Sequence, residues 1–87
     1  MPDCWRAMAV YFFDFRAGGR FSLDDEGEEL RDIVAAHDEA LEAFAQAIRE
    51  AVTEGRADQH FAVEVRDELG PVLAITGVIA STISRKQ

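Results

Sequence analysis

Residues 10–15 read Val-Tyr-Phe-Phe-Asp-Phe, and this short stretch decides the kind of fold to expect. Aromatic and β-branched residues of this density are typical of a β-strand. Successive side chains of a strand point to opposite faces, so Val10 and Phe12 share one face. The aromatic residues of the other face are Tyr11, Phe13 and Phe15. Both faces are apolar, which predicts a sheet that is covered on both sides.

The residues that follow predict a hairpin and then a polar connection. Gly18 and Gly19 tolerate positive φ angles, so the chain can turn there and return as a short strand at residues 21–23. Residues 24–29 read Asp-Asp-Glu-Gly-Glu-Glu. This stretch is too highly charged for a sheet, and we expect a solvated connector that also places negative charge near the start of the next helix.

Between residues 30 and 52 the apolar period changes to three or four, which predicts one long amphipathic helix. Asp32 is the expected N-cap because its carboxylate can accept hydrogen bonds from the free amides of the first turn. Gly55 is the expected C-terminal stop. The predicted apolar stripe consists of Leu30, Ile33, Val34, Leu41, Phe44, Ile48, Ala51 and Val52.

Two further strands complete the expected fold. Apolar and polar residues alternate strictly over 61–66, a turn follows at 67–71, and residues 72–80 form an almost wholly apolar last strand. The order ββαββ predicts an α+β domain with one long helix packed on a four-stranded, mainly antiparallel sheet. We expect this single domain to span residues 8–83, between an N-terminal extension at 1–7 and a polar tail at 84–87.

Length and charge limit what the chain can do. Its 87 residues and 9.7 kDa allow one domain, and its 17 acidic against 9 basic residues give a formal net charge of -8. Nucleic acids and anionic membranes are bound through clustered cations, so neither is an expected partner. A single cysteine, Cys4, permits no intrachain disulfide and favours a reducing, cytoplasmic location. No apolar run approaches the length of a membrane span.

The residue types that carry chemistry do not assemble into a recognisable motif. When Gly27 is placed sixth in a calcium-binding loop, the ninth and twelfth positions are Leu30 and Ile33, which are not ligands. His37 has no second histidine one turn away, so we expect a partly buried histidine at the edge of the helix. We therefore predict no catalytic residue, no metal, no cofactor and no enzyme activity.

The strongest functional expectation comes from the sheet. One helix covers only one face of a sheet, and an uncovered apolar face is larger than soluble monomers usually expose. A second copy of the chain is the simplest cover. We therefore predict a homodimer and a non-catalytic interaction or regulatory module that associates through its sheet. The predicted interface residues are Tyr11, Phe13, Phe15, Ile75 and Ile79.

Three segments of the chain resemble a family of short bacterial proteins that is classed as a domain of unknown function. They are Tyr11-Phe12-Phe13-Asp14, the acidic stretch continuing to Leu30, and Val63-Glu64-Val65-Arg66-Asp67-Glu68. The resemblance covers residues 8–80 and supports Met8 as the start of the domain. The chain departs from the family at Arg31, where members often have proline. The resemblance implies no activity, substrate or catalytic residue.

A second interpretation rests on the outline of the fold. A hairpin, an acidic helix with the run Glu-Ala-Leu-Glu-Ala at residues 39–43, and further strands are similar in outline to a HicB-type antitoxin domain. A basic toxin would complement the net charge of -8. The alternative function is therefore an antitoxin that binds a basic protein partner.

Overall fold

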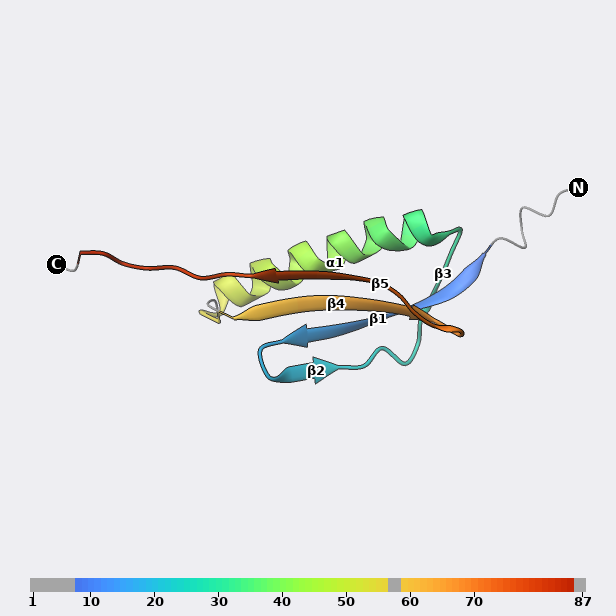
Figure 1. The fold of residues 1–87 in the computed structure, drawn as a ribbon, viewed down its shortest axis with the longest axis horizontal. Helices are drawn as coiled ribbons and strands as arrows, with labels where there is room; N and C mark the ends of the chain where they lie inside the picture. The colour runs from blue at the N-terminus through green and yellow to red at the C-terminus, as the bar shows by residue number, and fades with distance from the viewer. Residues whose placement is uncertain (1–7, 57–58, 86–87) are drawn as a thin grey trace, which may run out of the picture.

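The computed structural model describes residues 8–56 and 59–85, and it confirms the predicted α+β fold (Figure 1). Residues 1–7, which are the whole of the predicted extension and include Cys4, lie outside the described residues. The elements are β1 (Ala9–Ala17), β2 (Arg20–Ser22), β3 (Glu28–Leu30), α1 (Ile33–Thr53), β4 (His60–Asp67) and β5 (Gly70–Val78).

β1 lies at the centre of the sheet, and every pairing is antiparallel. One side of β1 pairs with β4, which in turn pairs with β5, so β5 is an edge strand among the described residues. The other side of β1 pairs with β3 at residues 9–11 and with β2 at residues 15–17. The predicted glycine turn is confirmed between β1 and β2, where Gly18 has a φ of 60°.

The acidic stretch holds a strand that the sequence did not predict. Glu28, Glu29 and Leu30 form β3, opposite Tyr11, Val10 and Ala9 of β1. Both glutamates are exposed at the edge of the sheet, so their charges stay hydrated while their backbones pair. The expectation of a four-stranded sheet with a purely polar connector was therefore wrong, because charge excludes a segment from the middle of a sheet but not from its edge.

The helix begins and ends at the expected signals. The side chain of Asp32 accepts a hydrogen bond from the Ala35 amide at 2.9 Å, which confirms the predicted N-cap. Beyond the C-terminus, Gly55 has a φ of 74°, and the Arg56 amide donates to the Ala51 carbonyl at 2.7 Å. The helix starts at Ile33, directly after this N-cap, while Leu30 at the start of the apolar period is held in β3.

The face that α1 turns to the sheet is lined mainly by alanines, and of the predicted stripe in the helix only Phe44, Ile48 and Ala51 pack there. Ala36, Ala40 and Ala51 are fully buried, and Phe44 packs beside them. Small side chains let the helix lie close to β4 and β5. Four members of the predicted stripe are instead exposed: Ile33, Val34, Leu41 and Val52.

Burial shows which face of each strand α1 covers. Phe61, Val63 and Val65 of β4 are fully buried beneath the helix, together with Tyr11 and Ala17 of β1. The opposite face carries Phe12, Asp14 and Arg16 of β1 and Ala62, Glu64 and Arg66 of β4. We call this opposite side the open face.

Gly77 in β5 provides a test of the close helix packing. A Cβ atom on Gly77 would lie 2.8 Å from Cζ of Phe44, so Gly77→Ala forces the ring to move. We expect a loss of about 1–3 kcal/mol in the free energy of unfolding, measured by urea denaturation. Gly19→Ala is the control, because a Cβ there meets no atom within 4 Å. Equal stability of the two variants would contradict the packing described.

Candidate functional site

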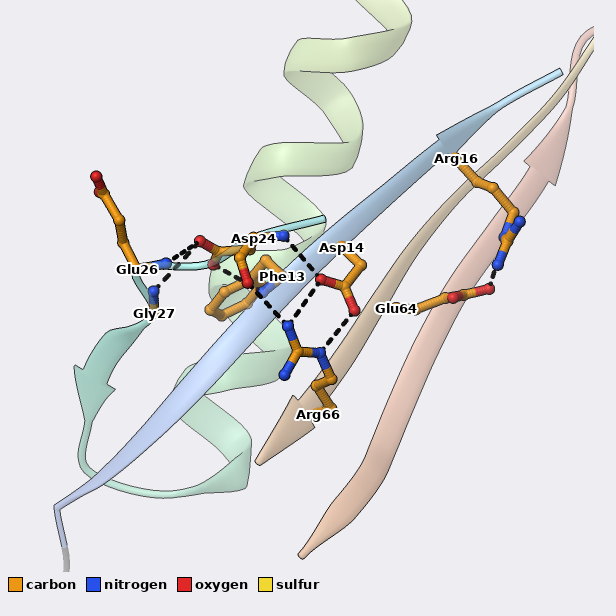
Figure 2. Close-up of polar contacts among 8 residues, drawn as sticks. All are labelled: Phe13, Asp14, Arg16, Asp24, Glu26, Gly27, Glu64 and Arg66. Carbon is orange, nitrogen blue, oxygen red and sulfur yellow. Dashed lines mark hydrogen bonds and ion pairs between the residues drawn. The ribbon is translucent and has the colours of Figure 1, made fainter. Parts of the chain in front are cut away.

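An ion pair between Asp14 and Arg66 is the most strongly buried charged feature of the described chain (Figure 2). Asp14 lies in the middle of β1 on the open face and is only 5% exposed. Nε of Arg66 donates to Oδ2 of Asp14 at 2.9 Å, and Nη2 approaches Oδ1 at 3.4 Å. Such two-pronged guanidinium–carboxylate contacts are stronger than neutral hydrogen bonds and fix the relative position of both groups.

Asp24 connects the loop between β2 and β3 to this ion pair. Its amide donates to Oδ1 of Asp14 at 2.9 Å, and its carbonyl accepts from Nη2 of Arg66 at 2.8 Å. Its own carboxylate accepts the amide of Phe13 at 3.0 Å and the amides of Glu26 and Gly27 at 3.0 and 3.2 Å. Figure 2 shows these three amides converging on the one carboxylate.

The position of Asp24 explains why a carboxylate is needed there. The outer side of β1 pairs with β3 up to Tyr11 and with β2 from Phe15, which leaves residues 12–14 without a strand partner on that side. A buried amide without a partner costs free energy, and the Asp24 carboxylate supplies the missing acceptor for Phe13. We call Asp14, Asp24 and Arg66, with the amides they bind, the polar network.

The rest of the open face over β1 and β4 is also polar. Arg66 stacks on the ring of Phe12 with 4.5 Å between the guanidinium carbon and the ring centroid. Arg16 stacks in the same way on Phe21 at 4.4 Å, and its Nε donates to Oε2 of Glu64 at 3.2 Å. Guanidinium groups shield aromatic rings from water in this arrangement. The expectation of a bare apolar second face was therefore wrong for β1 and β4.

The network shifts the pKa of two of its members. Burial alone raises the pKa of Asp24, but hydrogen bonds from the amides of Phe13, Glu26 and Gly27, together with the charge of Arg66, outweigh burial and lower the pKa. The hydrogen bond to Asp14 raises the pKa of Arg66, with the charges of Asp14 and Asp24 adding to it against partial desolvation.

The lowered pKa of Asp24 predicts a dependence of stability on pH. A carboxyl group whose pKa is lower in the folded state stabilises the fold above its unfolded pKa of about 3.9, and that contribution disappears as the pH falls through the folded pKa. We expect Asp24→Asn to destabilise the protein at pH 7 and to reduce the difference between urea midpoints at pH 7 and pH 3. Asp25→Asn, at an exposed neighbour, is the control. An unchanged pH dependence in Asp24→Asn would contradict this role.

The contacts of the network hold the loop with Asp24 to the sheet. The network's carboxylates are occupied by amide and guanidinium donors, and the described residues contain no group of three side chains suited to hold a metal ion. His37 is exposed, with Nδ1 at 3.8 Å from Asp38, which corrects the expectation of partial burial. Within the described part of the chain, no helix combines the length and apolar character needed to cross a membrane.

The five predicted interface residues all lie on the side of α1. Tyr11 belongs to the core, and Phe13, Phe15 and Ile75 are partly buried against the core beneath the helix. Ile79 packs in the same way beside Ala51 and Phe61. Alternation in the sequence separates the two faces of β1, but it does not reveal which face the helix covers. None of the five therefore lies on the open face.

Sequence reasoning missed the polar network, although a signal was present. Asp14 is the single charge within the aromatic stretch 10–15, and a charge at such a position is buried only when it is paired. Its partners lie far away in the sequence, and only the register Asp14↔Glu64 of the β1–β4 pair brings Arg66 within reach. The three segments that carried the family resemblance are the segments that meet in this network.

Comparison with known proteins agrees with that resemblance. No curated protein and no solved structure matches the chain. Residues 10–78 match the model of a family described as a domain of unknown function, DUF6894. The match includes β1 from Val10 onward, the loop with Asp24, all of α1 and β4 with Arg66. The chain therefore belongs to the DUF6894 family.

Proposed function

We propose that this chain is a non-catalytic interaction module that self-associates by pairing the outer edge of β5 with β5 of a second copy. The observation that carries the proposal is the absence of charge along this edge. Residues 69–84 contain no charged side chain, and this run is more than twice as long as any other uncharged run in the sequence. Long uncharged edge strands are templates for pairing with another chain.

The backbone of β5 presents regularly spaced hydrogen-bonding groups at this edge. The amide of Ile79 donates inward to the Gln59 carbonyl at 3.3 Å. Backbone groups alternate in direction along a strand, so the amides and carbonyls of Ala74, Thr76 and Val78 point outward. Among the described strands, β5 has β4 as its neighbour and ends the sheet. The outward groups can therefore form an antiparallel ladder without disturbing the ladder with β4.

The flank of α1 beside this edge carries exposed apolar side chains. On its other flank, Ala43, Gln46 and Glu50 line a pocket with Phe13 and Phe15 on the β1 side. A rotation of about 100° per residue puts the exposed residues of the predicted stripe on the opposite flank, toward β5. These residues are Val34, Leu41 and Val52.

A second copy fits this surface better than a different partner does. An antiparallel strand edge is self-complementary about a two-fold axis, and such pairing would join the two sheets and bring both α1 helices to the same side. Each copy carries a net charge of -8, so two copies repel overall, and contact through an uncharged surface keeps like charges apart. The apolar flanks of the two helices then approach each other across the joined strands.

Sedimentation velocity of the full chain at micromolar concentration tests the proposal. We expect a species of twice 9.7 kDa that dissociates on dilution and is not weakened by salt, because its contacts are uncharged and salt screens the repulsion between the two net charges. A chain that sediments at 9.7 kDa at every concentration would exclude the proposal.

Binding of a basic protein, as in the antitoxin interpretation, is a second candidate. The solvent side of α1 supports it, because Asp38, Glu39 and Glu42 are all exposed there. Uncompensated negative charge on a helix speeds the encounter with a cationic partner. This candidate predicts binding that weakens with salt, which distinguishes it from association through β5. A toxin-like neighbouring gene would favour it.

A further inference from the structure

Resting on the proposed self-association, we infer that residues 80–85 pair with the partner as a continuation of β5, which places the two-fold axis of the dimer near Val78. We call residues 80–85 the C-terminal arm. The two regions that pair, β5 and the arm, then form one continuous seam in each copy.

The C-terminal arm already has the shape of a strand. Figure 1 shows the chain continuing beyond β5 in the same direction, past the end of the helix. The inner ladder reaches Ile79, whose amide donates to the Gln59 carbonyl, and all residues from 80 to 85 are exposed. Ile83 is 76% exposed although it is one of the large apolar residues of the chain. An extended segment that exposes a large apolar side chain beside an edge strand is suited to pair with another chain.

The length of the seam determines the position of the axis. In an antiparallel pair of identical strands, the axis passes through the midpoint of the paired region. If Gly70–Val78 pairs alone, the midpoint is Ala74. If pairing extends to residue 85, the midpoint moves to Gly77 and Val78. The paired region is then sixteen residues long instead of nine, or roughly 53 Å instead of 30 Å at about 3.3 Å per residue.

Side-chain alternation supports the longer seam. Ile79 and Ile83 share the helix-covered face with Leu73 and Ile75, because side chains two residues apart lie on one face. With Val78 opposite its own copy, Ile83 would lie opposite Leu73 of the partner subunit. In each chain Leu73 packs in the cluster of Ala36 and Ala40, in the N-terminal half of α1. The exposed Leu41 lies on the flank of the same N-terminal half of α1, so the partner's helix would cover Ile83 at this position.

Cross-linking of single cysteines measures the position of the axis directly. In a Cys4→Ser background, Val78→Cys and Ala74→Cys each place a single thiol at an exposed residue whose backbone amide and carbonyl point away from β4. A short bismaleimide links two copies only where the thiol lies near the axis. We expect covalent dimers from Val78→Cys and none from Ala74→Cys, because the two Ala74 positions would be roughly 20–26 Å apart along the seam.

The other outcomes separate this inference from the proposed function. Cross-linking at Ala74 but not at Val78 would overturn the arm pairing and leave association through β5 intact. If neither variant cross-links and sedimentation shows dimers, an axis near Val78 is excluded and the arm inference fails, while the Thr76→Pro variant decides whether the β5 edge is the interface. If the full chain sediments as a monomer, the proposed function fails and the arm inference fails with it.

A truncation provides a second measurement. Ending the chain after Ile79, or replacing Ile83 by serine, should raise the dimer dissociation constant tenfold or more, because both copies lose a buried apolar side chain. Ser84→Ala is the matched control within the same segment. Circular dichroism confirms that each variant is folded, since the C-terminal arm is exposed and outside the core. An unchanged dissociation constant after truncation would overturn the inference.

Discussion

Asp14→Ala is expected to lower the free energy of unfolding by about 2–3 kcal/mol. The substitution leaves the Arg66 guanidinium and the Asp24 amide without their shared acceptor. Breaking a fully buried ion pair costs about 3–5 kcal/mol, and the partial exposure of Arg66 to water reduces that figure. For a domain with a typical total stability of about 5–15 kcal/mol, this is a large loss. Urea denaturation at pH 7 measures it.

The matched control for Asp14→Ala lies beside it on the same face. Glu64 stands opposite Asp14 in the register and pairs with Arg16, but both of those side chains are largely exposed. Glu64→Ala should therefore cost less than about 1 kcal/mol, as solvent-exposed ion pairs do. If the two variants lose the same stability, the polar network does not hold the loop to the sheet as described. In an Asp14→Ala/Arg66→Met double variant, the loss of unfolding free energy should be much smaller than the sum of the two single losses, because each change removes the same ion pair.

Thr76→Pro is expected to abolish self-association while leaving the fold intact. Proline removes the backbone amide, and at residue 76 that amide points away from β4. Proline is tolerated on edge strands for this reason, and Thr76 itself is exposed. The same change at an inward position would break the sheet. Sedimentation should show a monomer at every concentration at which the unchanged chain is a dimer.

Thr76→Ala separates the role of the backbone from that of the side chain. It keeps the outward amide, so we expect the dimer to persist with a dissociation constant within a few fold of the original. A folded Thr76→Pro variant that remains fully dimeric would show that β5 does not form the interface. Circular dichroism distinguishes a folded monomer from a variant that has lost the sheet.

Local patterns predicted the elements of the fold well. The alternation over 61–66 and the period of α1 are properties of consecutive residues, and both elements formed, with Asp32 and Gly55 at the expected ends of the helix. β3 was missed because its charges argue against a strand, whereas its edge position removes the cost of those charges. The difference between an edge and a central strand depends on the sheet order, which no local pattern contains.

The polar network and the true buried face of α1 could not be predicted for a related reason. Asp14 and Arg66 are 52 residues apart, and their contact depends on the register of β1 with β4. Likewise, hydrophobicity predicted Val34 and Leu41 as core residues, but both are exposed. The helix lies so close to the sheet, with the Phe44 ring against Gly77, that its alanine face packs there instead. Only the assembled sheet distinguishes a large side chain that fits from a small one that packs more closely.

Amide hydrogen exchange in β5, followed residue by residue by NMR, tests the central claim most directly. In a dimer joined along this edge, the outward amides of Ala74, Thr76 and Val78 should exchange as slowly as the inward amides of Ile75 and Gly77. Their protection should disappear on dilution, while that of the inward amides persists. Rapid exchange of all three outward amides at high protein concentration, beside protected inward amides, would show that the edge of β5 remains in water.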